Sequence, residues 1–257
     1  GGSEAVSLTQ KYQMAVILAG MATAFGILLA KMPDAHSMGD LLHVAGSMGK
    51  LEAVDFSLNP ETRYTIWSGI FGGLFLSLSY FGTDQSQVQR YLAGDSLRAS
   101  RLGLMFNAVF KIPMQFFILL LGALLFVFYQ FERPPLFFNE TTWEAHAGGE
   151  RGAEFRALEE RFEAVHTEKR ARISAWLAAR EAADQSAESA ARASMLDAHA
   201  ESQQVREEAR QALLAADERA KTTDSDFVFL TFIIDHLPHG VIGLLLAVIF
   251  AAALSST

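Results

Sequence analysis

The sequence predicts an all-α membrane protein, and the arrangement of its apolar residues is the first reason. The chain is 51% hydrophobic, and its apolar residues form long blocks such as residues 244–250 instead of recurring at a helix or strand period. Four apolar stretches cover about residues 12–31, 65–92, 101–131 and 237–257. Each is near the ~20 residues that a helix needs to cross a bilayer.

A charged segment between the last two stretches is the second reason. Residues 151–222 contain no proline, no glycine after Gly152, and much alanine, glutamate and arginine. Apolar residues recur there at spacings of three and four, which indicates amphipathic helices: Phe155, Leu158, Phe162, Val165, Ile173, Trp176 and Leu177, then Met195, Leu196, Val205, Leu213 and Leu214. Because residues 184–189 form helix least readily, we expect two long antiparallel helices standing out of the membrane. One continuous charged helix or a partly disordered tether is the alternative.

The first two spans differ in their glycine content. Residues 1–11 lead into the span at 12–31, in which Gly20 and Gly26 allow close helix approach. A long polar loop is expected at 32–64. The span at 65–92 holds four glycines, together with Ser77 and Ser79, which predicts a helix broken partway, as in many transporters.

The loop after the second span sets the orientation. It carries Arg90, Arg98 and Arg101 against the single acid Asp95, so the positive-inside rule places it in the cytoplasm. The loops at 32–64 and 132–236 then lie outside. We expect an integral, multi-pass protein of the inner membrane of a bacterium, with the insert outside the cytoplasm.

Composition excludes several classes of protein. There is no cysteine, hence neither a disulfide framework nor a cysteine–zinc site. The net charge of −8 argues against a nucleic-acid partner, which requires clustered cations. No phosphate loop or nucleophile elbow is visible, so we do not expect an enzyme. Both ends look cut, and we interpret the chain as an internal piece of a larger protein.

Four patches carry a resemblance to a known family. Residues 1–13 (GGSEAVSLTQKYQ) are similar to the pattern GGxxAVxxTDxxQ, with Gln10 in place of the usual acid. Residues 80–92 (YFGTDQSQVQRYL) are similar to (Y/W)xxxQxxVQRxL, Lys111 matches a lysine of sugar-carrying members, and residues 252–256 match AxxSS. The chain thus resembles the sodium:solute symporter family, which includes the sodium–glucose cotransporters.

The resemblance implies a fold and a domain division. It implies a fragment of a transporter core of five plus five helices in inverted repeat, here core helices five to eight. We expect three transmembrane helices within residues 1–136, an extracytoplasmic charged helical insert at 137–225, and a final, truncated transmembrane helix at 226–257. The insert is not covered by the resemblance.

The same resemblance implies a sodium site at the end of the chain. Na⁺ is a hard cation that prefers oxygen ligands. The hydroxyls of Ser255 and Ser256 and the carbonyl of Ala252 supply three of about five, and the first core helix supplies the rest. From the residues alone, adjacent serines near a helix end bond to their own backbone. We expect Na⁺ as the coupling ion and no other metal.

Substrate residues are expected on the second and third spans. In relatives an aromatic residue at the Tyr80 position stacks on the substrate, and Phe81 lies next to it. Ser77 falls at the position of a polar contact with a sugar. For the two aromatic residues, ordinary packing is the alternative. Lys111 is a cation in an apolar helix, which donates to a sugar in relatives or else extends to the cytoplasmic edge. Gln115 lies at i+4 from Lys111, on the same face.

Other polar residues receive structural interpretations. Asp84 and Arg90 are expected to form an ion pair, and a proton or sodium path through Asp84 is the alternative. We reject a metal site at His236 and His239, because Pro238 between them breaks helix spacing. Asn139-Glu140-Thr141 fits a glycosylation acceptor in a eukaryotic secretory route.

The function predicted is sodium-coupled symport of a small organic solute by alternating access, with a sugar as the best single guess. The alternative is a membrane receptor or sensor whose insert binds a protein partner. A channel lined by the polar residues around Asp84 is a third possibility. The lipid bilayer is a partner in every case.

Overall fold

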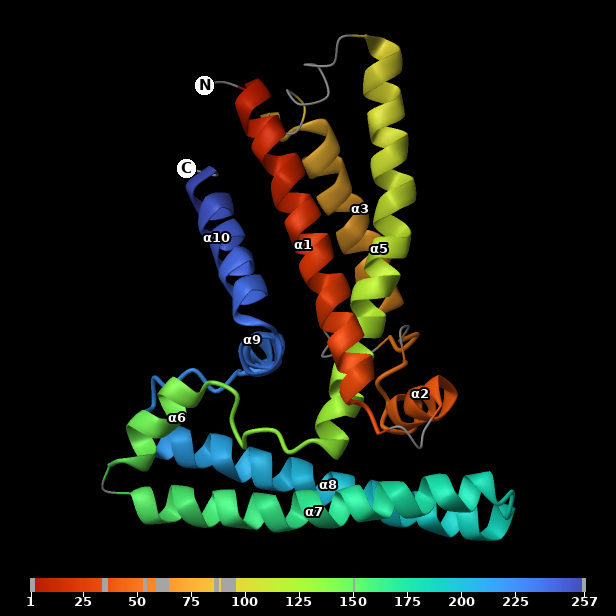
Figure 1. The fold of residues 1–257 in the computed structure, drawn as a ribbon, viewed down its shortest axis with the longest axis vertical. Helices are drawn as coiled ribbons and strands as arrows, with labels where there is room; N and C mark the ends of the chain where they lie inside the picture. Colours follow the sequence, from red (N-terminus) through yellow and green to blue (C-terminus); the bar gives the residue numbers. More distant parts are fainter. Residues whose placement is uncertain are drawn as a thin grey trace. The chain divides into compact units, whose positions relative to one another are not determined.

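The computed structural model describes residues 3–33, 37–52, 55–58, 65–85, 88, 96–149 and 151–255, and the regular structure within them is entirely helical, as predicted (Figure 1). The chain divides into two units. The first unit consists of Gly1–Met48 and Leu124–Thr257, and the second consists of Gly49–Ala123. The first unit holds α1 (Ser3–Lys31), α2 (Met38–Ser47), α6 (Glu140–Ala147), α7 (Gly152–Glu181), α8 (Gln185–Ala216), α9 (Ser225–His236), α10 (His239–Ser255) and the end of α5 (Leu97–Phe131). The second unit holds α3 (Ile66–Gly82) and the rest of α5.

Within the part of the chain that the structure describes, two helices are long and apolar enough to cross a membrane by length and composition. They are Leu8–Lys31 within α1, with 24 residues, and Leu97–Phe131, with 35. At 1.5 Å per residue they extend about 36 and 52 Å, beyond the ~30 Å hydrocarbon core. The apolar helices α3 and α10 have 17 residues each, or about 26 Å.

The segment at 32–64 is not only a loop. Residues 38–47 form α2, whose N-terminus carries a capping box: Ser37 Oγ accepts from Asp40 N, and the Asp40 carboxylate accepts from Ser37 N at 3.0 Å. This reciprocal pair satisfies two of the amides that a helix start leaves without partners. The prediction of a polar loop missed this helix because three glycines dominate the segment.

The predicted break in the second span does not lie within α3. The helix runs from Ile66 to Gly82 without interruption and ends at Thr83. Glycine lowers helix propensity but keeps the backbone amide, so Gly69, Gly72 and Gly73 weaken the helix without removing a hydrogen bond. The last part of the predicted span, residues 89–92, lies outside the described residues.

Helices α7 and α8 lie side by side and form one hairpin (residues 152–216; Figure 1). The turn at 182–184 contains Ala183 at φ 55, and Asp184 Oδ1 caps α8 through the amides of Ser186 and Ala187. The apolar positions predicted from spacing face inward: Phe155, Phe162, Val165, Ile173, Trp176, Leu177, Met195, Val205 and Leu213 are buried. That part of the sequence prediction is confirmed.

The base of the hairpin shares a core with the segment before it. Trp143 of α6 packs with its ring centroid 4.6 Å from that of Phe155, and its indole donates to Glu159 Oε1 at 2.6 Å. Leu136 and Phe137 complete this core. Burying a large apolar side chain of this kind contributes about 1.5–3 kcal/mol, so α6 is part of the same folded body as the hairpin.

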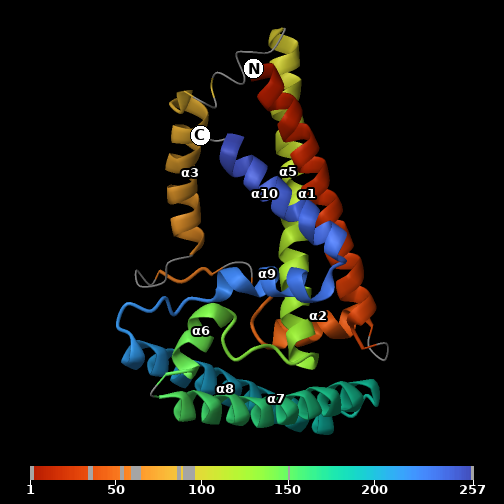
Figure 2. The same ribbon diagram turned by 60° about the vertical axis from the view of Figure 1, so that its left-hand side comes forward.

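The hairpin runs crosswise to α1 and lies beyond the C-terminal end of that helix in both views (Figures 1 and 2). The expectation that these helices stand out of the membrane stays a prediction. Local contacts hold the crosswise orientation: the middle of α7 contacts the end of α5, where His166 Nε2 lies 3.2 Å from the carbonyl oxygen of Tyr129. The far end of α7 contacts α2 through Arg180.

Candidate transport site

The candidate sodium residues lie at the end of α10. This helix starts after Leu237-Pro238, where the Pro238 carbonyl accepts from the amides of Val241 and Ile242 at 2.9 and 3.1 Å. Ala252 is an exposed residue of its last turns and Ser255 is its final residue. Ser256 and the side chain of Ser255 lie outside the described residues. The sodium ligands therefore remain a prediction.

The candidate substrate residues on α3 share one stretch of the helix. Ser77 and Tyr80 are three residues apart and exposed, with Tyr80 at 42%. The side chain of Phe81 is outside the described residues. All side chains from 67 to 80 are exposed, so this unit presents α3 as an open apolar surface that carries a few polar groups.

Lys111 and Gln115 lie one turn apart on the exposed part of α5. Pro113 between them does not interrupt the helix, which continues from Leu97 to Phe131. Both sets of candidate substrate residues are exposed, so the structure does not bring Ser77 and Tyr80 together with Lys111 in a buried site. Their assignment rests on the motifs.

The Asp84–Arg90 ion pair also remains a prediction, because Arg90 lies outside the described residues. Asp84 follows the end of α3, and its amide donates to the carbonyl of Ser79 at 3.0 Å. His236 has a packing role: its ring lies 5.3 Å from the ring of Phe128 and 5.0 Å from that of Phe232. These contacts join the end of α5 to α9.

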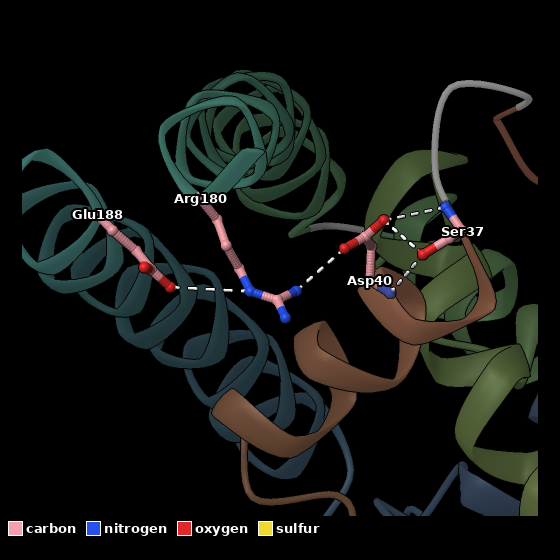
Figure 3. Close-up of polar contacts among 4 residues, drawn as sticks. All are labelled: Ser37, Asp40, Arg180 and Glu188. Atoms are coloured by element: carbon pink, nitrogen blue, oxygen red, sulfur yellow. Dashed lines mark hydrogen bonds and ion pairs between the residues drawn. The ribbon is translucent and has the colours of Figure 1, made fainter. Parts of the chain in front are cut away.

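Sequence reasoning missed an ion-pair cluster between α2 and the hairpin (Figure 3). Arg180 Nη1 lies 3.0 Å from Asp40 Oδ1, and Arg180 Nε lies 3.8 Å from Glu188 Oε1. The same Asp40 carboxylate closes the capping box with Ser37. One arginine thus joins α2, α7 and the start of α8. The Ser37-x-x-Asp40 pattern was a usable signal for the helix, but the partner 140 residues away had no local signal.

Sequence reasoning also missed a buried cationic group inside the hairpin. Lys169 is 3% exposed and donates to the hydroxyl of the fully buried Ser202 at 3.1 Å. Burial and the nearby Arg206 lower the pKa of Lys169 to about 7. Burial and the charge of Lys169 lower the pKa of His166 to about 4. A signal was present, because Lys169 occupies a position of the apolar stripe of α7.

Arg206 completes this group from α8. Its guanidinium lies 4.8 Å from the centroid of Phe162 and 5.3 Å from that of Phe138, and it donates to the carbonyl of Pro135 at 3.0 Å. Burial lowers its pKa to about 10, although Asp224 opposes this effect. The two buried cations, Lys169 and Arg206, therefore contact aromatic faces, a carbonyl and a hydroxyl, which stabilise charge less than a paired carboxylate does.

Comparison with known proteins finds relatives over about half of the chain. The sodium/iodide cotransporter of Homo sapiens is 33% identical over 131 residues, which are 50% of this chain and 20% of that protein. The sodium-dependent multivitamin transporter of Oryctolagus cuniculus is 34% identical over 134 residues, or 51% and 20%. Sodium-coupled monocarboxylate transporter 1 of Mus musculus is 33% identical over 109 residues, or 42% and 17%.

The chain spans about a fifth of the length of these relatives. No family model matches it, and no solved structure matches it significantly. The names of these relatives specify iodide, monocarboxylates and vitamins, so the prediction of a sugar gains no support from them.

Proposed function

We propose that the intact protein is a sodium-coupled symporter of a small solute. The curated relatives of this chain are members of the sodium:solute symporter family, as the four motif patches predicted. It is an integral membrane protein in which sodium entry drives the solute inward by alternating access. The single observation that carries this proposal is the identity of 33–34% to three transporters whose names specify sodium.

Na⁺ is the coupling ion of the proposed cycle. The Ala252 carbonyl and the hydroxyls of Ser255 and Ser256 form the part of its site that this chain supplies. A hard cation in a membrane requires such oxygen donors, because lipid offers none. The match of residues 252–256 to the AxxSS pattern supports this assignment.

We propose that Lys111 selects the solute, that Tyr80 stacks on the solute, and that Ser77 and Gln115 make polar contacts with it. A sugar hydroxyl accepts from an ammonium group. Iodide and a monocarboxylate, the cargo named for two of the relatives, are singly charged anions that pair with it directly. A small monocarboxylate is therefore the second candidate substrate beside a sugar.

The experiment uses the full-length protein in sealed vesicles with labelled solutes. We expect uptake driven by an inward sodium gradient and not by potassium, and exchange of labelled for unlabelled solute. Ser256→Ala should raise the sodium concentration for half-maximal uptake, whereas Ser189→Ala, on the exposed face of α8, should not. Equal uptake in sodium and potassium would contradict the proposal.

The same vesicles separate the substrate classes and the rival functions. Lys111→Gln should abolish uptake of an anionic solute and only weaken that of a sugar, because glutamine donates hydrogen bonds without charge. A receptor does not exchange solute, and a channel conducts without saturation. Either result would replace the symporter by the corresponding alternative.

We propose that the insert modulates the transport rate or docks a neighbouring protein. Replacement of residues 149–222 by a short flexible linker removes the hairpin and leaves α6 and α9 in the chain. Sodium-coupled uptake should persist with a changed rate. Loss of membrane insertion by this variant would contradict a modulatory role.

A further inference from the structure

Helix α10 lies directly against α1 at a glycine. Gly20 is buried, and a methyl group at its α-carbon would lie 2.6 Å from Leu245 Cδ2 and 3.2 Å from Leu245 Cγ. Such distances are shorter than ordinary van der Waals contact, so Leu245 occupies the space that the absent side chain leaves. One turn further along α1, Ala24 is fully buried. Small residues at a helix contact let two axes approach closely.

The face of α10 that contacts α1 continues to the candidate sodium residues. Leu245 is partly buried and Val248 is 7% exposed, whereas their neighbours Leu246 and Ile249 are exposed. Ala252 is seven residues beyond Leu245, which is almost two full turns, so it lies on the same face and about 10 Å along the axis. A shift of α10 away from α1 at Leu245 therefore moves the Ala252 carbonyl.

We propose that Gly20 is a positioning residue for the sodium site: its lack of a side chain lets Leu245 seat α10 against α1, and this contact fixes the position of the Ala252 carbonyl. The inference rests on the proposed function, because it assigns a role relative to that sodium site. Binding sites require their ligands within about 0.5 Å of the productive geometry. Interaxial distances vary with the side chains at the contact, so a larger residue at position 20 exceeds that tolerance.

The test measures sodium-dependent uptake by the full-length protein and by four variants. Gly20→Leu inserts a side chain at the contact, and Gly20→Ala is a milder form that still folds if the leucine does not. Gly26→Leu makes the same change on the same helix, at a site where an added methyl meets nothing within 4 Å in the described part of the chain. Gly20→Leu combined with Leu245→Ala restores space at the contact.

We expect Gly20→Leu to raise the half-saturating sodium concentration about tenfold, which corresponds to 1.4 kcal/mol of lost sodium binding. Gly20→Ala should raise it less, because the end of the Leu245 side chain can turn aside. Maximal uptake and the KM for solute at saturating sodium should stay within twofold of the parent. The Leu245→Ala combination should recover most of the sodium affinity, and Gly26→Leu should retain it.

Several results would overturn the inference while leaving sodium symport intact. They are an unchanged sodium requirement in both Gly20 variants, a loss of maximal uptake alone, an equal effect of Gly26→Leu, or no recovery with Leu245→Ala. Absence of sodium-driven uptake by the parent protein is a different outcome, since it removes the proposed function and this inference with it.

Discussion

Replacement of Lys169 by methionine should make the α7–α8 hairpin more stable at neutral pH. Lys169 is buried at the contact of α7 with α8, and its one described hydrogen bond is to Ser202. No described carboxylate lies among the groups that perturb it; the causes are burial and Arg206. Methionine has a similar length and no charge, and it fills irregular core space readily.

The magnitude follows from the difference in pKa between the two states. Burial lowers the pKa of Lys169 from 10.5 to about 7 in the folded hairpin. Below pH 7 the amine is charged in both states and its burial cost is fully present. That cost is at most about 5 kcal/mol, since one pKa unit corresponds to about 1.4 kcal/mol. Loss of the bond to Ser202 offsets about 1–2 kcal/mol, so we expect a net gain of about 1–3 kcal/mol.

The pH dependence has a definite sign. Between pH 7 and 10.5 the unfolded hairpin binds a proton on Lys169 that the folded hairpin does not, so the parent becomes more stable as pH rises. Above 10.5 the amine is neutral in both states and the burial cost disappears. The methionine variant has no such group, hence its advantage over the parent should shrink across this window.

A cysteine introduced into the hairpin provides the assay, because these 257 residues contain no cysteine of their own. Ala209→Cys places a thiol at a fully buried position of α8. Its labelling rate in the full-length protein, normalised to the urea-unfolded protein, gives the free energy of opening of the hairpin. At pH 7 the Lys169→Met variant should be protected about tenfold or more above its parent, which is about 1.4 kcal/mol.

An exposed lysine supplies the control. Lys221 has a side chain that is 66% exposed and lies 3.7 Å from Asp226, so Lys221→Met should change neither the protection nor its pH dependence. If Lys169→Met were less protected than the parent at pH 7, and both responded equally to pH, Lys169 would stabilise the hairpin as a charged group and the reasoning would be wrong.

Three further results should follow with the same cysteine reporter. Since burial lowers the pKa of His166 from 6.5 to about 4, the parent should lose up to about 3 kcal/mol of hairpin stability as pH falls through this window, and His166→Gln should flatten that loss. A double-mutant cycle of Arg180→Ala with Asp40→Asn should give a coupling of about 0.2–1 kcal/mol, because both side chains are about one third exposed, and a coupling of zero would make the ion pair incidental. Phe155→Ala should cost the hairpin about 3–5 kcal/mol, and a cost below 1 kcal/mol would contradict its central place in the core.

The sequence predicted the buried faces of the hairpin correctly because amphipathic spacing is a local signal. Phe155, Phe162 and Ile173 recur at the helical period, and no distant residue is needed to identify them. The apolar helices were predictable for a similar reason, since a bilayer demands length and composition alone.

The direction of the hairpin could not be predicted from the same signals. Its crosswise orientation depends on pairs such as Arg180 with Asp40 and Arg206 with the Pro135 carbonyl, which are 140 and 71 residues apart. Lys169 was missed for another reason: its position in the apolar stripe of α7 was a signal, but a charged residue there was not interpreted as buried.

For the candidate site, motifs identify residues but not their geometry. The AxxSS pattern selects Ala252, Ser255 and Ser256 by type and spacing. The distance from α10 to α1 depends on Gly20, which the sequence suggested only as a place of close helix approach. The contact of Gly20 with Leu245 depends on the register of two helices more than 200 residues apart in the chain, and no local pattern encodes that register.

The point where the insert leaves and rejoins the chain has a consequence for its folding. The amide of Phe138 donates to the buried carboxylate of Asp224 at 2.8 Å, across 86 residues, so entry and exit are adjacent. An insert whose two ends are adjacent does not pull apart the segments that precede and follow it. The contacts within the insert join helices that are neighbours in the sequence, and such local contacts form quickly. Such a module can fold as soon as it emerges, and it can be lengthened or shortened at its far turn without changing the register of the apolar helices that flank it.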